Sequence, residues 1–554
     1  MELLKTIFGF SQDSPLLFTQ FYFWGFFAAV LVIFSVLHPY RAARNAFLFL
    51  ASLFFYYKTS GFFFVILLFS TLSDYLIGFA IHNSEHKPIR RFWMILSVTI
   101  NLAVLSYFKY SYFFTESFND LFGTQVEYFN HFNFWANDLT GSQFSVDRLL
   151  PPVGISFFTF QTISYAVDVY QRKIGPVRNI LDFGFYVSFF PQLVAGPIVR
   201  AAEFIPQIYQ PYNVSNREFS IAAFWILKGL VKKLWLADYI GVNFVDRVFE
   251  NPELFTGFEN LMGLYGYSLQ VYADFSGYTD IAIGVALLMG FRLPVNFNYP
   301  YKARSVGEFW KRWHISLSTW LKDYLYIPLG GSRNSSFLTW FFYALIPIGA
   351  VWYFGVQFMP AVIFISVLVL LFFMYLDFKT PRTRVELATA SNLMLTMLLG
   401  GLWHGSSWMF VIWGGLNGVG LVVYKFWRRI SPWEGKKQWY WTAWAIFITF
   451  NFITFTRIWF RSPDLATADL VMAQIQSNFG WEYIPEVLNN YANVFYVMYL
   501  GFVMHWIPES WKTQIKESFV GLPIGWKALA AVVAVFVAYQ AVSSDLQPFI
   551  YFQF

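Results

Sequence analysis

The chain contains no cysteine among its 554 residues. Without a thiol, the sequence excludes a cysteine nucleophile, a thiolate metal site and disulfide bonds. Charged residues make up only 13% of the chain, about half of the roughly 25% that is usual in soluble globular domains. No GxSxG elbow, P-loop or dinucleotide fingerprint occurs in a usable context, which leaves little support for serine-hydrolase or nucleotide chemistry.

Apolar residues are abundant instead: 57% of the chain is hydrophobic and 23% is aromatic. A soluble protein of this size could not cover so much apolar surface with polar groups, so long apolar runs must face lipid. The formal net charge of +6 is modest for this length. We therefore interpret the basic excess as the loop charge of a membrane protein rather than as a nucleic-acid-binding surface.

Runs long enough to cross a bilayer recur along the chain, since a crossing helix needs about 20 apolar residues. Shorter runs broken by Gly and Pro fit re-entrant or interior helices. We predict an all-α polytopic membrane protein with about 11–14 crossing helices. In the absence of an internal repeat, we expect a single domain over 1–554. The longest apolar runs are 16–37, 61–81, 92–108, 153–170, 337–353, 360–376, 408–424, 440–456 and 523–542, and the broken ones include 260–290 and 387–403.

Loop charges predict the orientation. Basic residues outnumber acidic ones in 82–91, 171–179 and 292–333, whereas acidic residues outnumber basic ones in 109–150. Because basic loops stay in the cytoplasm, the first three segments are expected there and 109–150 outside.

Residues 308–333 carry an aromatic stripe. Trp310, Trp313 and Trp320 recur at helical spacing, which predicts one amphipathic helix in the cytoplasmic membrane interface, ended by Pro328 and the glycines that follow. His314 lies beside this stripe. From spacing alone, it is either part of an interfacial anchor or a functional group.

His404 lies within GLWHGSSW, residues 401–408, between two strongly apolar runs. A buried imidazole needs hydrogen-bond partners, so His404 is either a satisfied structural group or a proton carrier. Ionisable groups at membrane depth are functional candidates by default. Carboxylates there also need partners, and for these we expect contacts that join helices: Asp74, Asp168, Asp274 and Asp280.

His82 and His86 have a spacing typical of metal ligands on a helix, but no third ligand lies nearby in the sequence. We therefore predict no metal site.

Several long stretches resemble the membrane-bound O-acyltransferase superfamily. They are EFWKRWHISLSTWLKDYLYIPLGG at 308–331, GLWHGSSWMFVIWG at 401–414, LLPPVGISFFTFQTISYAVDVY at 149–170, FFPQLVAGPIVR at 189–200 and YADFSGYTDIAIGVALLMGFRLPVNFNYPY at 272–301. Within the superfamily the sequence is similar to the bacterial alginate O-acetylation proteins and teichoic-acid D-alanyltransferases, and YIPLGGSR favours the alginate type. The resemblance covers about residues 45–430. Residues 431–554 carry no matched motif and are expected to add further spans.

The resemblance implies long tilted helices around a central tunnel, and acyl transfer from a cytoplasmic thioester to a hydroxyl acceptor beyond the membrane. The central histidine of the family corresponds to His404 and the second one to His314. A hydroxyl is a weak nucleophile until a base takes its proton, and histidine suits that role.

The developing oxyanion of the thioester needs hydrogen-bond donors. The candidates are Trp403, Gly405, Ser406 and Trp408. On the donor side we expect His314 to act with basic residues that suit phosphates or an acidic carrier: Lys311, Arg312 and Lys322.

We expect no tightly bound cofactor and no metal, with acetyl-CoA or an acylated carrier protein as co-substrate. The resemblance implies the bacterial cytoplasmic (inner) membrane as location, and a polysaccharide or an extracytoplasmic hydrolase-like acetyltransferase as acceptor. Two alternatives stay open: D-alanyl or other acyl transfer to a cell-wall polymer, and a transporter or flippase. Transporters often have two matching halves, which this sequence lacks.

Overall fold

The computed structural model describes residues 9–10, 15–140, 151–194, 196–334, 336 and 381–541. All regular elements in these ranges are helices, as predicted. The chain divides into two compact units: unit 1 comprises 1–97, 157–318 and 435–554, and unit 2 comprises 98–156 and 319–434. The single-domain organisation and the central tunnel stay predictions.

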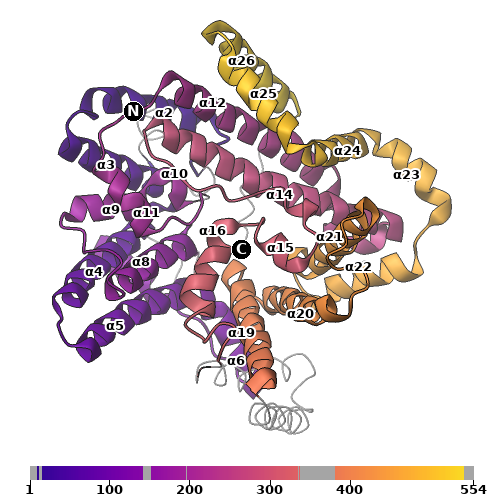
Figure 1. Ribbon diagram of the computed structural model, residues 1–554, viewed down its shortest axis with the longest axis horizontal. Coiled ribbons are helices and arrows are strands. Elements are labelled where there is room, and N and C mark those ends of the chain that lie inside the picture. Colours follow the sequence, from indigo (N-terminus) through magenta and orange to yellow (C-terminus); the bar gives the residue numbers. More distant parts are fainter. Residues whose placement is uncertain are drawn as a thin grey trace. The chain divides into compact units, whose positions relative to one another are not determined.

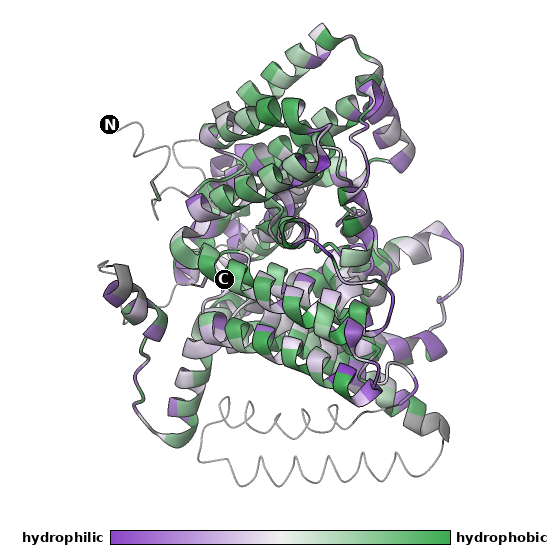
Figure 2. Cartoon of the chain, turned by 90° about the vertical axis from the view of Figure 1, so that its left-hand side faces the viewer, coloured by the Kyte–Doolittle hydropathy of each residue, from purple (hydrophilic) through white to green (hydrophobic). Residues whose placement is uncertain are grey.

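Within the described residues, five helical stretches are long and apolar enough to cross a membrane: Arg41–Asn83, Lys87–Phe122, Val385–His404, Trp408–Ile430 and Trp439–Arg461. Phe21–Leu37 and Ile524–Phe536 are shorter apolar helices. Figure 2 shows that hydrophobic residues, in green, occur throughout the helices of the described chain. The class of multi-pass membrane protein is therefore confirmed. The number of crossings stays a prediction, and the expected spans 337–353 and 360–376 lie outside the described residues.

Unit 1 contains helices from the first part of the chain, up to residue 318, and the C-terminal helices from residue 435 on (Figure 1). In the first part are α2 (Phe21–Leu37), α3 (Arg41–Ser60), η1 (Gly61–Phe63), α4 (Phe64–Asn83), α5 (Lys87–Leu105, shared with unit 2), α8 (Ile155–Tyr170), α9 (Ile180–Ser188), α10 (Phe190–Leu193), α11 (Ala201–Ile208), α12 (Asn216–Leu230), the π-helices η3 (Val231–Asp238) and η4 (Gly241–Val245), α13 (Asp246–Glu250), η5 (Pro252–Leu254) and α14 (Gly257–Leu288). Then follow η6 (Pro300–Lys302), α15 (Val306–Trp310), α16 (Ile315–Trp320), α21 (Trp439–Arg461), α22 (Leu465–Ser477), η9 (Trp481–Tyr483), α23 (Ile484–Asn490), α24 (Ala492–Trp506), α25 (Glu509–Gly521) and α26 (Ile524–Ala541).

The core of unit 1 is the 32-residue helix α14, which lies along α12 (Figure 1). It starts with a capping box, in which the Thr256 hydroxyl accepts from the Glu259 backbone N–H and the Glu259 carboxylate accepts from the Thr256 backbone. Most of its side chains are buried all round, as in an interior helix. The apolar run 260–290 thus forms an interior helix, as predicted, and Gly277 does not break it.

Ion pairs join α14 to the preceding helices. Lys233 lies 2.6 Å from both Asp238 and Asp274, and the Asp280 carboxylate accepts from Lys228 at 3.1 Å and from Lys232 at 2.8 Å. These contacts confirm that the intramembrane carboxylates join helices. The same holds for Asp74 of α4, which accepts from Ser97 of α5 at 2.5 Å. The ion pair of Asp168 is local instead, because Lys173, 3.3 Å away, lies in the turn directly after α8.

The C-terminal helices, which carry no recognised motif, pack on this core. Helices α21, α22 and α24 contact α14, whereas α25 and α26 contact α12. The last fifth of the chain is therefore part of the packing of unit 1 rather than an appended tail.

Unit 2 contains the rest of the described chain: η2 (Ser106–Tyr110), α6 (Ser111–Phe122), α7 (His131–Thr140), η7 (Leu321–Tyr326), α19 (Pro381–His404) and α20 (Trp408–Ile430). Helices α19 and α20 form a hairpin whose backbones nearly touch. A Cβ atom on Gly401 would overlap the Phe410 carbonyl, and one on Gly414 would overlap the Met397 carbonyl. Such close crossings through small residues are typical of membrane helices.

The prediction of one continuous interfacial helix over 308–333 is wrong. The chain forms α15, breaks over 311–314, and resumes as α16 and the π-helix η7. Trp313 and Trp320 are buried rather than presented to lipid. The break has a local cause, because His314 has a positive φ of 43° that a right-handed helix cannot contain. The predicted end of the element agrees with the structure, since η7 stops at Tyr326, shortly before Pro328.

Candidate functional site

His404 is the last residue of α19 and is buried, with 2% of its surface exposed. Its ring lies between two indoles: the centroids of Trp403 and Trp413 are 5.1 Å and 5.0 Å away, each nearly perpendicular to the imidazole. The imidazole thus occupies an apolar, aromatic setting in which an ionisable group needs a functional or structural reason.

The sequence after His404 explains why the helix ends there. The ring of Phe410 packs so closely against Gly405 that any Cβ atom at this position would overlap it. Ser407 then has extended backbone angles and precedes the first turn of α20. A three-residue turn, 405–407, therefore reverses the chain directly beside the imidazole.

Two side chains from η2 satisfy the open carbonyl groups at the end of α19. The Lys109 ammonium donates to the carbonyls of Trp403 at 2.8 Å and His404 at 3.3 Å, and the Tyr110 hydroxyl donates to the Leu402 carbonyl at 2.9 Å. A cation at a helix C-terminus also complements the helix dipole.

Sequence reasoning missed the role of Lys109, which it counts with the acidic outside segment 109–150. In the structure Lys109 lies inside the continuous helical stretch Lys87–Phe122 rather than in a loop, and the side of the membrane on which 109–150 lies stays a prediction. The sequence does contain one indication of its role, because Lys109 is a single lysine among aromatic residues, in Tyr107–Tyr110, directly after an apolar run.

The oxyanion candidates differ in their surroundings. The Trp408 indole N–H donates to the Ser117 hydroxyl at 3.1 Å, and its ring packs on Phe113 at 5.2 Å. Trp408 is therefore already engaged. Trp403 is buried. The half-buried Ser406 makes no side-chain hydrogen bond in the described part of the chain, so its hydroxyl is open to a ligand. Their roles, and that of Gly405, stay predictions.

His314 lies in unit 1, in the break between α15 and α16, and is fully buried. Its ring meets Phe275 of α14 edge-on, with centroids 4.6 Å apart. The segment before η6 holds the break: Ile315 donates to the Asn296 carbonyl at 2.9 Å, and the Ser316 hydroxyl donates to the Asn296 side chain at 2.9 Å. A strained backbone held by its surroundings is typical of functional sites.

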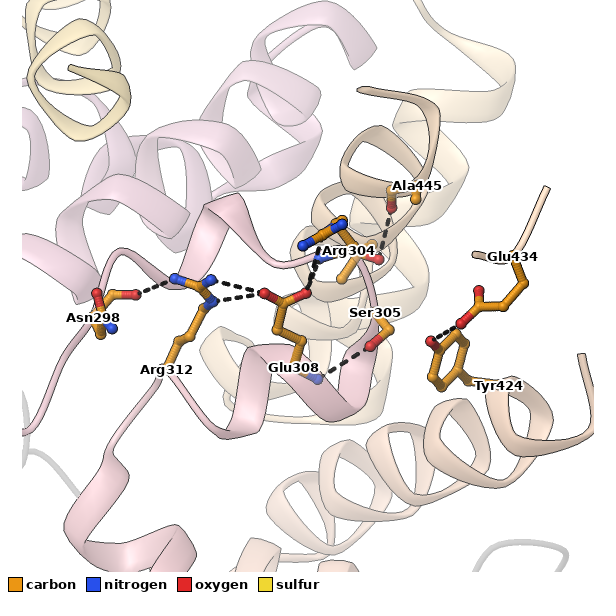
Figure 3. A network of polar contacts seen from close by, with 9 residues as sticks. Asn298, Arg304, Ser305, Glu308, Arg312, Tyr424, Glu434 and Ala445 are labelled. Atoms are coloured by element: carbon orange, nitrogen blue, oxygen red, sulfur yellow. Dashed lines mark hydrogen bonds and ion pairs between the residues drawn. The ribbon is translucent and has the colours of Figure 1, made fainter. Parts of the chain in front are cut away.

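The expected donor-side residues are not equally free to bind an anion. Figure 3 shows Arg312 in a two-pronged contact with Glu308, at 3.0 and 2.8 Å, while it also donates to the Asn298 carbonyl at 3.2 Å. A phosphate would have to compete with these partners. Lys311 and Lys322 are exposed, and neither makes an ion pair within the described ranges.

The structure brings together one set of predicted residues: Trp403, His404, Gly405, Ser406 and Trp408 surround the same turn of unit 2. Lys311, Arg312 and His314 lie in unit 1, and Lys322 lies in η7 of unit 2. Over the residues described, no group of three His, Asp or Glu side chains could hold a metal ion.

Comparison with known proteins places these features in a family. The profile of the membrane-bound O-acyltransferase family matches residues 92–385, which include His314 and end before His404. The chain is 31% identical to the peptidoglycan O-acetyltransferase of Helicobacter pylori, over 84% of this chain and 81% of that protein. It is 35% identical to the probable alginate O-acetylase of Pseudomonas aeruginosa, over 69% of this chain and 60% of that protein.

A more distant relative is the teichoic acid D-alanyltransferase of Bacillus subtilis, at 27% identity over 56% of this chain and 68% of that protein. With a profile match over more than half of its length and a relative aligned over most of both chains, this multi-pass membrane protein belongs to the membrane-bound O-acyltransferase family.

Proposed function

We propose that the protein transfers an acetyl group from a cytoplasmic thioester to hydroxyl groups of a cell-wall or exported polysaccharide, either directly or through an extracytoplasmic partner. The names of the relatives support an acetyl group and a polysaccharide acceptor. They are bacterial proteins, so we place the chain in the cytoplasmic membrane. The observation that carries the proposal is the buried imidazole of His404 at a helix end that opens into a tight turn.

In the proposed reaction, His404 acts as general base. Its neutral imidazole takes the proton of the acceptor hydroxyl while the hydroxyl oxygen attacks the thioester carbonyl. The C–O bond forms, the C–S bond breaks, and the proton passes from the imidazole to the departing thiolate, so the products are an ester and a free thiol. A positioned general base contributes about 10²- to 10⁴-fold in rate.

The surroundings of His404 fit this role. The indoles of Trp403 and Trp413 flank the imidazole and exclude water, which would otherwise hydrolyse the acyl group. Lys109 fixes the backbone of His404 through its carbonyl. We assign the oxyanion contact to the Ser406 hydroxyl, which has no competing partner in the described chain, ahead of Trp408, whose N–H is occupied.

On the donor side, we assign a supporting role to His314 and the basic residues near it. Lys311 is exposed beside His314 in sequence and suits a phosphate of coenzyme A or an acidic group of a carrier protein. Replacing His314 by Ala is therefore expected to weaken transfer without loss of membrane insertion.

The test is transfer of radiolabelled acetyl from acetyl-CoA, or from an acetylated carrier protein, by the purified chain in lipid vesicles, with and without glycan acceptors. His404→Gln keeps the volume and some hydrogen bonding of the imidazole but cannot act as a base. We expect it to insert and fold normally and to lose about 10²- to 10⁴-fold in rate. The exposed His131→Gln is the matched control and should keep full activity. A stable His404→Gln protein with near wild-type transfer would return His404 to a structural role.

D-alanyl transfer is the second candidate, because the Bacillus subtilis relative is a teichoic acid D-alanyltransferase. The same assay separates the two: a D-alanyl-carrier thioester offered in place of the acetyl donor should give little transfer if the acetyl assignment holds.

A further inference from the structure

A group of lysines gathers in unit 1 where the turn between α24 and α25 meets η3 and η6. We call it the lysine cluster: Lys228, Lys232, Lys302 and Lys512. They come from three separate parts of the sequence: Lys228 and Lys232 lie one turn apart at the junction of α12 and η3, Lys302 lies in η6, and Lys512 lies in α25. None belongs to the residues assigned to acyl transfer. The side chain of Lys232 is 15% exposed and that of Lys228 is 32% exposed.

The cluster holds more positive than negative charge, since two carboxylates face its four lysines: Asp280, and Glu509, whose charge acts on Lys302 and Lys512. Asp280 is shared by Lys228 and Lys232. Lys302 and Lys512 make no ion pair in the part of the chain that the structure describes. Their ammonium groups donate to backbone carbonyls, Lys302 to Ile507 at 3.0 Å and Lys512 to His505 at 2.8 Å. Each ammonium has three donors, so most of their hydrogen-bonding capacity is left for solvent or a ligand.

Aromatic rings line the same place. Lys512 lies 3.3 Å above the ring of Tyr299, and Lys302 lies 5.2 Å from it. Tyr299 itself has a positive φ of 45°, a strained conformation for a tyrosine. A strained residue persists only when its surroundings hold it, and here it presents its ring to two cations.

His505 adds a buried polar group to the cluster. Its side chain is 3% exposed and its ring lies among the tyrosines, 4.8 Å from Tyr272 and 5.1 Å from Tyr301. Neither ring nitrogen hydrogen-bonds to a side chain within the described residues. Lys232 lies 5.3 Å from the same Tyr272 ring, so the imidazole and this lysine both lie against one tyrosine.

The lysines repel one another. Burial, followed by the charges of Lys302 and Lys232, lowers the pKa of Lys512 to about 7. In the neighbouring ion-pair network the carboxylates outnumber the cation, since Asp238 and Asp274 both lie 2.6 Å from Lys233. An unmatched set of cations around rings is instead the arrangement expected where an anion binds.

We propose that the lysine cluster is a binding site for a phosphate-bearing anion. A phosphate group carries enough negative charge and enough acceptor oxygens to bind several ammonium groups at once. The site is expected on the cytoplasmic side, since Lys302 belongs to the basic segment 292–333. Two sources share this chemistry: the head group of an anionic phospholipid and a soluble phosphate compound. The proposal goes beyond acyl transfer and requires neither a donor nor His404.

The experiment measures binding and thermal unfolding of the full chain. One arm titrates radiolabelled inorganic pyrophosphate onto the protein in detergent. The other compares phosphatidylcholine nanodiscs with nanodiscs that also contain phosphatidylglycerol. We expect tight binding in at least one arm, together with a higher unfolding temperature: binding in the first identifies a soluble ligand, and binding in the second identifies a head group.

The test variant is Lys302→Gln combined with Lys512→Gln, and the matched control is Lys527→Gln, whose ammonium already donates to the Ser220 hydroxyl at 2.7 Å. The double variant should weaken binding about tenfold or more, as loss of charge-assisted hydrogen bonds does. Without ligand it should unfold at a higher temperature than wild type, because the repulsion is relieved. If the double variant does not insert, Lys512→Gln alone serves for both measurements.

Binding to neither probe by the wild type would overturn the proposal. So would equal binding by wild type and the variant. A variant that is less stable than wild type in the absence of ligand and responds to both probes as wild type does would make the lysines structural.

Discussion

His404 and Lys109 meet at one helix end: the imidazole belongs to α19 and the ammonium reaches its carbonyls from η2. The two residues therefore depend on each other in a way that no distance along the sequence indicates. Within the described residues, Lys109 donates to the backbone oxygens of Trp403 and His404 and to the Ser156 hydroxyl. We expect it to act by positioning the His404 turn.

Lys109→Met removes these donors and keeps most of the side-chain volume. Since carbonyl groups in an apolar setting lose their partner, we expect a loss of about 1–3 kcal/mol in stability, seen as a lower unfolding temperature, and a fall in kcat with little change in KM. Lys109→Arg, which can still donate, should recover part of both. Unchanged kcat in the Met variant would contradict the positioning role.

Trp408 offers a second test, because its N–H already bonds to the Ser117 hydroxyl. If this contact is structural, Trp408→Phe and Ser117→Ala should each lower stability by about 0.5–1.5 kcal/mol and leave the transfer rate within a few-fold of wild type. The loss of stability in the double variant should not exceed the sum of the losses in the two single variants. A large loss of kcat in Trp408→Phe that Ser117→Ala does not share would instead make the indole an oxyanion donor.

At this scale, sequence reasoning succeeds where chemistry is local and fails where partners are distant. The apolar context of His404 and the turn after it follow from Gly405 and its neighbours. The helix-joining carboxylates follow from the cost of burying a charge. The position of Lys109 does not follow, because its partners lie almost 300 residues away.

Among the helices, α12 shows how a terminus is stabilised by sequence. The Glu218 carboxylate accepts from the Ser215 backbone and hydroxyl, both at 2.9 Å, and pairs with Arg292 at 2.5 Å. The bonds to the Ser215 backbone and to Arg292 lower the pKa of Glu218 from 4.5 to about 2. This cap holds the start of a helix that carries Lys228 toward the core.

The lowered pKa gives a pH dependence of stability. A carboxylate with a depressed folded pKa stabilises the protein fully above its unfolded pKa of 4.5 and loses that contribution as the pH falls toward 2. Glu218→Gln should therefore lower the unfolding temperature at neutral pH, by the equivalent of about 0.5–2 kcal/mol as for loss of a helix cap. The difference from wild type should shrink below pH 4.5 and vanish only below pH 2. A constant difference across that range would contradict the assignment.

Some elements could not be foreseen from periodicity. The stripe through Trp310, Trp313 and Trp320 has helical spacing, yet the chain breaks at His314 because tertiary contacts from Asn296 hold a positive φ there. No glycine or proline marks the break. The π-helices η2, η3 and η7 each shift the faces of a helix by one residue, which a fixed period of 3.6 cannot describe.

For the molecule as a whole, composition and the order of the motifs are enough to predict the all-α membrane class and the family. Membrane class follows from the shortage of charge, which is a property of the entire chain. The role of residues 439–541 does not follow, because packing on α14 depends on side-chain shape and leaves no repeated signal in the sequence.

The orientation of the chain is open to a direct test. Reporters fused after Lys173, in a basic segment, and inserted near Asp138, in an acidic one, should report the cytoplasm and the outside respectively. A two-sided transfer reaction needs these opposite locations, so the same compartment for both reporters, or the reverse pair, would contradict it. A reporter between α20 and α21, near Lys436, should read as cytoplasmic.

The contact between Gly401 and Gly414 has one more consequence. Where two helices touch backbone to backbone, no side chain between them can change rotamer to make room, and parting them leaves peptide groups facing hydrocarbon. The α19–α20 hairpin is therefore expected to behave as one rigid element, with the imidazole of His404 at its turn. Any conformational change that exposes the His404 imidazole must therefore occur in elements other than the α19–α20 hairpin.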